Sequence, residues 1–289
     1  MTIGLLLSGE LGYKLLKKIH IDYDIIFIST DSKSKKIISY AKNYNINFFV
    51  GNPRNKKLVN YLNFIKCDIL ASINYLFLID KEIIDISRKI TFNIHGSLLP
   101  KYRGRTPHVW AIINGENKCG ITSHVIDEGC DTGDIIFQKE VKINIHDTGF
   151  SILKKYEKLY YPIFKKTINL ISKKNKSFIK QNNSLSSYFG KRTEDSGLID
   201  WSWKSKYIYN WVRAQSNPYP GAFSIIKKKK LIIDWVEITK IKFDVNISNG
   251  TIISVNNNSM LIKVSDGILK ITKIRNFKFN QFKSNQILK

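Results

Sequence analysis

The sequence predicts an α/β protein with a Rossmann-like, mostly parallel sheet, followed by a smaller β-rich domain. Over the first two-thirds of the chain, short apolar runs alternate with segments of helical periodicity, and such alternation implies parallel strands joined by right-handed crossovers. Beyond about residue 184, short apolar runs alternate with turn residues, as in an antiparallel sheet or a small OB-like barrel. Residues 174–183 are rich in Lys and Asn, a composition typical of a linker. We therefore expect domains at 1–183 and 184–289.

The expected elements follow in chain order. Apolar runs predict strands at 3–7, 23–29, 47–50, 68–72 and 89–95, and helical periodicity predicts helices between them, from 9 to 19 and at 34–44, 56–65 and 80–87. Asp80 is a suitable N-cap for the last of these helices. A helix at 107–115, strands at 120–125 and 135–141, and a long helix at 147–173 come next. The β-rich part has expected strands at 222–226, 231–238, 250–255, 260–264 and 268–275.

The formal charge of +24 suggests a nucleic-acid partner. However, 40 of the 47 basic residues are lysines, and they are spread along the chain. Lys, Asn and Ile are all abundant here, and all three have A/T-rich codons, so a biased genome would produce the same surplus. Solvated surface is therefore the favoured interpretation, and nucleic acid is not expected as a partner.

The remaining composition points to the cytoplasm and away from metals and membranes. The three cysteines are scattered and the histidines lack metal-binding spacing, so neither a disulfide framework nor a metal site is expected. No apolar run approaches the roughly 20 residues that span a bilayer. The N-terminus has no basic region ahead of its apolar residues, so we expect no signal peptide and no membrane association.

Two short motifs are the most informative feature of the chain: F-N-I-H-G-S-L-L-P at 92–100 and D-E-G-C-D-T-G-D at 127–134. Side chains two apart in a strand share a face, so Asn93 and His95 are expected side by side where the strand ends. An amide can stabilise an oxyanion, an imidazole can move a proton near neutral pH, and a carboxylate can orient that imidazole. The set suits acyl transfer to an amine, although loop capping would also explain an isolated Asn–His pair.

These motifs resemble those of the folate-dependent formyltransferases, which transfer a formyl group from N10-formyltetrahydrofolate to an amine. The resemblance implies that N10-formyltetrahydrofolate is the formyl donor. It also implies that Asn93, His95 and Asp131 form the catalytic set. Weaker similarity extends to 188–201 and 213–223.

The resemblance further implies a folate site. Residues 72–79 are expected to line the pterin pocket, and the backbone of the acidic loop is expected to contact the pterin. The residues assigned to this role are Asn74, Tyr75, Leu76, Phe77, Asp127 and Gly129. Core packing is an equally good explanation for Leu76 and Phe77. Repulsion among the carboxylates of the loop is expected to raise the pKa of one of them.

Cations beside aromatic rings suggest where an acceptor with a diphosphate would bind. The residues assigned are Tyr102, Arg103, Lys191, Arg192, Arg213, Asn217 and Tyr219. Ordinary surface exposure would explain each arginine near residue 103 singly, and the tryptophans at 201, 203 and 211 are expected to pack the domain interface.

The segment 101–116, K-Y-R-G-R-T-P-H-V-W-A-I-I-N-G-E, resembles sugar-nucleotide N-formyltransferases. The resemblance implies that the acceptor is an amino-deoxy sugar on a nucleotide of dTDP or GDP type, used for surface polysaccharide such as lipopolysaccharide O-antigen. Methionyl-tRNA formyltransferase is the first alternative and a non-catalytic RNA-binding protein the second. Whether the protein is a homodimer is left open.

Overall fold

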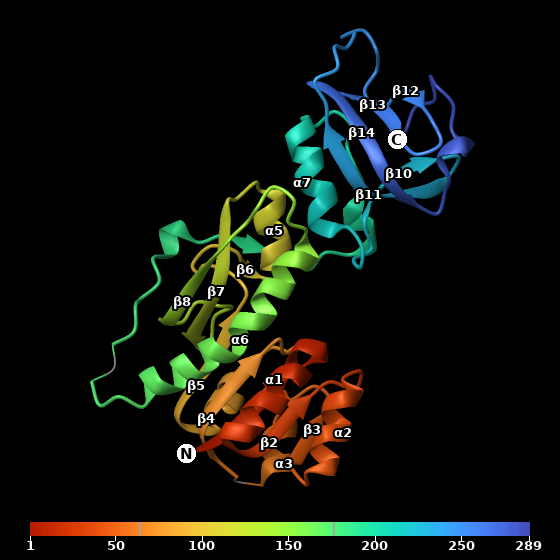
Figure 1. Ribbon diagram of the computed structural model, residues 1–289. Helices are drawn as coiled ribbons and strands as arrows, with labels where there is room; N and C mark the ends of the chain where they lie inside the picture. Colours follow the sequence, from red (N-terminus) through yellow and green to blue (C-terminus); the bar gives the residue numbers. More distant parts are fainter. Residues whose placement is uncertain (64, 176) are drawn as a thin grey trace. The chain divides into compact units, whose positions relative to one another are not determined.

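The computed structural model describes residues 1–63, 65–175 and 177–289 of the chain (Figure 1). Their contacts divide the chain into two compact units. The first comprises Met1–Gly104, Gly120–Val141 and Lys155–Tyr188, and the second comprises Arg105–Cys119, Lys142–Lys154 and Phe189–Lys289.

A seven-stranded sheet forms the centre of the first unit, with strand order β3-β2-β1-β4-β5-β7-β8. Strands β1 to β5 pair in parallel, whereas β7 runs antiparallel to β5. The predicted Rossmann-like, mostly parallel sheet is therefore confirmed. The bounds are β1 (Thr2–Leu7), β2 (Asp24–Thr30), β3 (Asn47–Val50), β4 (Cys67–Ile73), β5 (Ser87–His95), β7 (Lys118–Val125) and β8 (Ile135–Lys142).

Helices connect these strands and share a buried core with them. Their bounds are α1 (Gly9–Asp22), α2 (Lys35–Asn43), α3 (Lys57–Leu62), α4 (Lys81–Ile84) and the long α6 (Gly149–Ile171). Leu6, Phe27 and Leu70 of the strands pack with Leu58 of α3 and Ile83 of α4, and all five are almost completely buried. Full burial of such a side chain is worth about 1.5–3 kcal/mol. This packing fixes the strands in the interior, so their carboxyl ends are held at one edge of the sheet.

The second unit contains a five-stranded antiparallel sheet with the order β10-β11-β14-β13-β12, shown in blue in Figure 1. This confirms the predicted β-rich C-terminal part. Lys227 and Lys228 form the turn of the first hairpin, both with positive φ. The bounds are β10 (Ala222–Ile226), β11 (Lys229–Ile238), β12 (Ile252–Val255), β13 (Met260–Val264) and β14 (Gly267–Arg275).

Two helices accompany this sheet, α5 (Pro107–Ile113) and α7 (Ser205–Gln215), and α7 packs against both α5 and β11. Helix α7 was not predicted. The short elements are β6 (Arg103–Gly104), which pairs with β9 (Tyr188–Phe189), and the 3-10 turns η1 (Asn183–Leu185), η2 (Glu194–Gly197) and η3 (Phe279–Gln281).

The division of the chain into 1–183 and 184–289 stays a prediction. Each of the two compact units is built from three separate segments of the chain. Residues 105–119 and 142–154 group with the C-terminal sheet although they precede residue 184. A sequence pattern can identify α5 as a helix, but it does not show which hydrophobic surface that helix covers.

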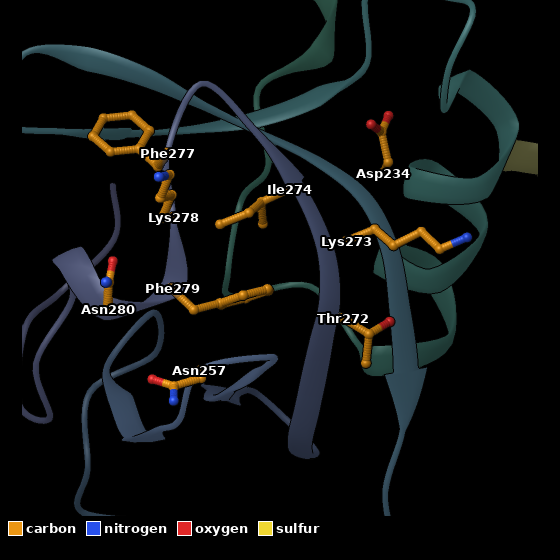
Figure 2. A pocket seen from close by; sticks show the side chains of 9 residues that line it. All are labelled: Asp234, Asn257, Thr272, Lys273, Ile274, Phe277, Lys278, Phe279 and Asn280. Atoms are coloured by element: carbon orange, nitrogen blue, oxygen red, sulfur yellow. The ribbon is translucent and has the colours of Figure 1, made fainter.

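A cavity of about 560 Å³ lies in the second unit, next to β14 (Figure 2). Its wall includes Asn257, Lys273, Phe277 and Phe279, and it contains none of the site residues assigned from the sequence.

Among the helices of the described residues, none is both long and apolar enough to cross a membrane.

Candidate active site

Strand β5 carries the amide and the imidazole of the first motif. In the register with β7, Asn93 lies opposite His124. Phe92, the neighbour of Asn93, points to the other face of the sheet, where its ring packs 5.9 Å from that of Phe164 in α6. The alternation of one strand therefore separates a polar face, where Asn93 and His95 end the strand, from the apolar core.

His95 and Asp131 face each other at the carboxyl end of β5. Nδ1 of His95 lies 3.6 Å from Oδ2 of Asp131, and Nε2 of His95 donates to the carbonyl oxygen of Tyr102 over 2.9 Å. Because a carbonyl oxygen only accepts, Nε2 carries the proton of the neutral ring. Nδ1 is then the nitrogen that can take up a proton, and the nearby carboxylate stabilises the charged ring that would result.

Residues 102–104 hold both of these groups through their backbone. The carbonyl of Tyr102 accepts from His95, and the amide of Gly104 donates to Oδ2 of Asp131 over 2.9 Å. Tyr102 has φ +60° and Gly104 has φ +94°, so the turn requires the left-handed region at both positions, which favours glycine. Tyr102 was expected to bind the acceptor; in the structure its side chain is buried and its backbone orients His95.

His124 of β7 completes the cluster and was not predicted. Its Nδ1 donates to the carbonyl of Val125 over 2.8 Å, which leaves Nε2 of the neutral ring as an acceptor. Nε2 lies 3.2 Å from the amide nitrogen of Asn93 and 3.4 Å from Oδ1 of Asp131. His124 thus contacts the amide and the carboxylate assigned to catalysis. Its place depends on the pairing of β7 with β5, which no spacing in the sequence reveals.

Burial and charge set the protonation of this cluster. Burial lowers the pKa of His95 below its usual range, against the opposing effects of the Asp131 carboxylate and the bond to Tyr102. Burial alone would raise the pKa of Asp131, but the positive charge that His95 carries when protonated, together with the Gly104 amide, lowers it well below normal. The expectation that carboxylate repulsion would raise a pKa in this loop is wrong for Asp131. The cluster combines a neutral imidazole with an ionised carboxylate.

The acidic loop is held in a tight conformation. The side chain of Asp127 accepts from the hydroxyl of Thr132 (2.6 Å) and the amide of Gly129 (3.2 Å). A Cβ on Gly133 would lie 2.1 Å from the carbonyl oxygen of Val125, so only glycine fits there. Asp131 itself has φ +57°. The two residues expected to contact folate, Asp127 and Gly129, therefore shape the loop, and a folate contact by them stays a prediction.

Residues 74–77, expected to contact the pterin, follow β4 directly. Ile73 of β4 pairs with Ile94 of β5, so residue 74 leaves the sheet beside the end of β5. The Asn74 amide donates to the carbonyl of Ser8 over 2.9 Å. The Tyr75 hydroxyl bonds the hydroxyl of Ser29 over 2.8 Å. Leu76 is 46% exposed, and the ring of Phe77 lies 5.4 Å from that of Tyr75. Asn74 and Leu76 are thus the exposed side chains of this segment, whereas Tyr75 and Phe77 are partly buried.

The arginines assigned to the acceptor differ in their surroundings. Arg103 is buried, and its guanidinium donates to the side chains of Gln181 and Asn183. Arg213 is buried as well, and donates to Asn210 (2.9 Å) and to the carbonyl of Asp147 (2.6 Å). A phosphate would have to displace these bonds, so the geometry favours structural roles for Arg103 and Arg213.

Arg192 lies between two indole rings in the second unit, 4.8 Å from the ring of Trp110 and 4.5 Å from that of Trp211. It donates to the carbonyl of Ser196 and to Gln215 (2.9 Å). These two ring contacts and two hydrogen bonds restrict the orientation of its guanidinium.

The other residues assigned to the acceptor in this unit are less enclosed than Arg213. Lys191 and Asn217 are exposed. The Tyr219 hydroxyl bonds Nε2 of His108 over 3.0 Å, and burial raises the pKa of Tyr219 to about 12.

Within residues 1–63, 65–175 and 177–289, no group of three or more His, Cys, Asp or Glu side chains is arranged to hold a metal ion.

Two family models match the chain: formyl transferase over residues 9–168, and formyl transferase C-terminal domain over residues 191–289. The chain belongs to the formyl transferase family. The resemblance inferred from the two motifs is thereby confirmed, as is the inference that the protein is an enzyme of this family.

Two curated relatives of this formyl transferase differ in the share of their own length that the chain covers. It is 40% identical over 264 residues to the bifunctional polymyxin resistance protein ArnA of Wigglesworthia glossinidia brevipalpis, which covers 88% of this chain but 38% of that relative. It is 34% identical over 221 residues to the methionyl-tRNA formyltransferase of Caldicellulosiruptor saccharolyticus, covering 76% of this chain and 70% of that enzyme. The chain therefore spans well under half the length of the first relative.

Two solved structures resemble the formyl transferase over nearly its full length. WlaRD, a sugar 3N-formyl transferase crystallised with dTDP and 5-N-formyl-THF, has a TM-score of 0.69 at 26% identity and covers 96% of this chain and 98% of its own. The N-formyltransferase from Helicobacter canadensis, crystallised with folinic acid and dTDP-3-aminofucose, has a TM-score of 0.67 at 24% identity and covers 94% and 98%. The second likeness shows the shared fold alone.

Proposed function

We propose that this formyl transferase moves a formyl group from N10-formyltetrahydrofolate to the amine of a nucleotide-linked amino-deoxy sugar, in the cytoplasm. The choice of acceptor rests on the similarity to WlaRD over nearly the full length of both chains. The resemblance of segment 101–116 to sugar-nucleotide enzymes supports it. We further predict that the product is used in surface polysaccharide. We also predict that the protein forms a homodimer.

In the proposed reaction, the neutral acceptor amine attacks the formyl carbon. A bond forms between the amine nitrogen and that carbon, and the bond from the carbon to the donor nitrogen breaks. The amine proton passes to Nδ1 of His95 and then to the departing nitrogen. His95 can take this role because its buried ring is neutral and its open nitrogen faces Asp131 at 3.6 Å.

Asn93 is proposed to stabilise the oxyanion that develops as the amine adds. An amide N–H that is already oriented is effective because it needs no reorganisation when the charge appears. One hydrogen of the Asn93 amide points to Nε2 of His124 at 3.2 Å. The other hydrogen is then aimed in a defined direction by the same bond, since the amide group is planar.

The folate is proposed to lie against residues 74–77 and the acidic loop of the same unit. The 46% exposed side chain of Leu76 supplies an apolar wall, and the turns supply backbone polar groups, which is what a flat heterocycle needs. Asn74 and Tyr75 hold this segment through their bonds to Ser8 and Ser29.

The nucleotide diphosphate is proposed to contact Lys191, Arg192, Asn217 and Tyr219 of the second unit. Arg192 contacts its two indole rings and donates to Ser196 and Gln215 through Nη2, so a phosphate is proposed to meet the Nη1 edge of its guanidinium. Lys191 adds an exposed positive charge next to it.

A direct assay tests the acceptor. Purified protein is incubated with N10-formyltetrahydrofolate and, in separate reactions, with dTDP-, GDP- and UDP-linked amino sugars, and products are identified by mass spectrometry. We expect a formylated sugar nucleotide from at least one of them. The proposal would be refuted if the protein formylated none of these sugar nucleotides but formylated methionyl-tRNA efficiently.

Methionyl-tRNA formylation is the second candidate. The 34% identity to the enzyme of Caldicellulosiruptor saccharolyticus and the charge of +24 favour it. The two candidates differ in salt dependence, because contacts with many phosphates weaken steeply as salt rises. Filter binding of total tRNA across a salt series is expected to show only weak association. Tight binding without any formyl transfer would instead favour a non-catalytic RNA-binding protein.

A further inference from the structure

Residues 181–188 contact the backbone of the acidic loop at three carbonyl groups, all within the first unit. The side-chain amide of Gln181 donates to the carbonyl oxygen of Asp131 over 2.9 Å and to that of Gly133 over 2.6 Å. The hydroxyl of Tyr188 donates to the carbonyl of Cys130 over 2.7 Å. The loop that carries the proposed catalytic carboxylate is therefore held by hydrogen bonds from a segment outside the loop.

Arg103 fixes the orientation of the Gln181 amide. Its Nε and Nη2 atoms donate to the Gln181 side-chain oxygen over 3.2 and 2.7 Å, and Nη2 also donates to Asn183 over 2.8 Å. Turning the amide over would place its NH₂ group against the guanidinium and its oxygen against two carbonyls. The network thus permits one orientation, in which both hydrogens of Gln181 point to the loop.

The same short turn also holds the two groups proposed to act in proton transfer. Arg103 stands between Tyr102, whose carbonyl accepts from His95, and Gly104, whose amide donates to Asp131. Asp131 is consequently restrained twice, at its carboxylate by Gly104 and at its backbone by Gln181. The second restraint matters because the backbone of Asp131 has φ +57°, a conformation that persists only where the surroundings enforce it.

We propose that Gln181 and Arg103 are positioning residues that set the place of the Asp131 carboxylate relative to His95. The proposal rests on the catalytic roles proposed above for His95 and Asp131. It replaces acceptor binding as the role of Arg103 and assigns a role to Gln181, which the sequence had not singled out.

Three variants test the proposal. Gln181→Met keeps the length of the side chain and removes both N–H donors. Arg103→Lys keeps the charge but not the two-pronged donor geometry. Leu185→Ala is the matched control, since Leu185 lies in the same segment and its side chain is 58% exposed. The double variant Arg103→Lys/Gln181→Met shows whether the two residues act through one chain of contacts.

We expect Gln181→Met to lower kcat by about 10- to 100-fold with little change in KM, because a displacement of about 1 Å at a reacting group can cost a factor of that size. The kcat of Arg103→Lys should lie between that of Gln181→Met and that of the wild type. The double variant should be no slower than Gln181→Met alone. Equal kcat for Gln181→Met and the Leu185→Ala control, or fold-changes that multiply in the double variant, would overturn the proposal.

The pKa of His95, measured by NMR on histidine-labelled protein, supplies a readout that does not depend on turnover. The Asp131 carboxylate raises that pKa, so a displaced loop should lower it in Gln181→Met and leave it unchanged in Leu185→Ala. An unchanged His95 pKa in a folded Gln181→Met variant contradicts the proposal. If the wild type formylates no acceptor in the panel, the proposed function fails, while this NMR comparison still decides the positioning role.

Discussion

Nε2 of His124 lies 3.2 Å from the amide nitrogen of Asn93, directly across the β5–β7 pair. Because Nδ1 of His124 is committed to the carbonyl of Val125, the neutral ring can only accept at Nε2. The Asn93 amide is thereby turned with its nitrogen toward β7. The orientation of the proposed oxyanion donor is therefore a property of the neighbouring strand.

This relationship predicts a defined defect in His124 variants. His124→Phe removes the acceptor and should lower kcat by at most about 10²- to 10³-fold, the range for complete loss of one oxyanion donor, with little effect on folate affinity. His124→Gln retains an acceptor oxygen and should be less impaired. Steady-state kinetics on both variants measures the difference, and equal activity of His124→Phe and the wild type would contradict the assigned role.

Replacement of Asp131 by Asn should impair proton transfer and shift its pH dependence. We expect kcat to fall by about 10²- to 10⁴-fold, the range of a general acid–base contribution. The carboxylate raises the pKa of His95, so its loss should move the acidic limb of the pH–rate profile to lower pH. A limb that stays in place, or moves to higher pH, would show that His95 does not act with Asp131.

His95 should also make folding stability depend on pH. Its pKa in the folded state is lowered by burial, so below its unfolded value of about 6.5 the unfolded chain binds a proton that the folded protein does not. The stabilisation is present above that value and is lost as pH falls, by at most about 1.4 kcal/mol per pH unit for one group. Urea unfolding at pH about 7.5 and about 5.5 should show a smaller loss in His95→Asn than in the wild type. An equal loss in both proteins would mean that the buried ring does not contribute.

Arg213→Ala should destabilise the folded protein. The variant removes the guanidinium that donates to the carbonyl of Asp147 and to the side chain of Asn210, and loss of a donor to a buried group costs about 1–3 kcal/mol. The free energy of unfolding should fall accordingly, whereas exposed Lys191→Ala should leave it unchanged. An Arg213→Ala protein of normal stability with a raised acceptor KM would restore the role first assigned to this residue.

The parts of the structure that depend on local pattern could be predicted from the sequence. Strand β5 alternates apolar and polar residues, which was enough to place Asn93 and His95 together, and βαβ alternation was enough for the sheet. Residues whose position depends on tertiary pairing could not be found this way. His124 requires the register of β7, and Gln181 lies 50 residues from Asp131 in the sequence.

Burial was the other property that local pattern did not supply. Arg103 and Arg213 look like surface cations because each stands near turn-forming residues, yet both are almost fully buried and hydrogen-bonded to neighbouring segments. Helix α7 was missed although Ile208 and Val212 are four residues apart, because several aromatic and polar residues interrupt the apolar pattern around them. Its packing partners are β11 and α5, and α5 lies about 90 residues away in the sequence.

The proposed formyl transfer requires His95 to accept the proton of the sugar amine. Single-turnover formylation of the sugar nucleotide identified in the panel, with saturating N10-formyltetrahydrofolate, measures this step in the wild type and in His95→Asn. We predict that the wild type forms the formylated sugar nucleotide and that His95→Asn is slower by about 10²- to 10⁴-fold while still binding both substrates. A near-normal rate in His95→Asn would show that His95 does not accept this proton.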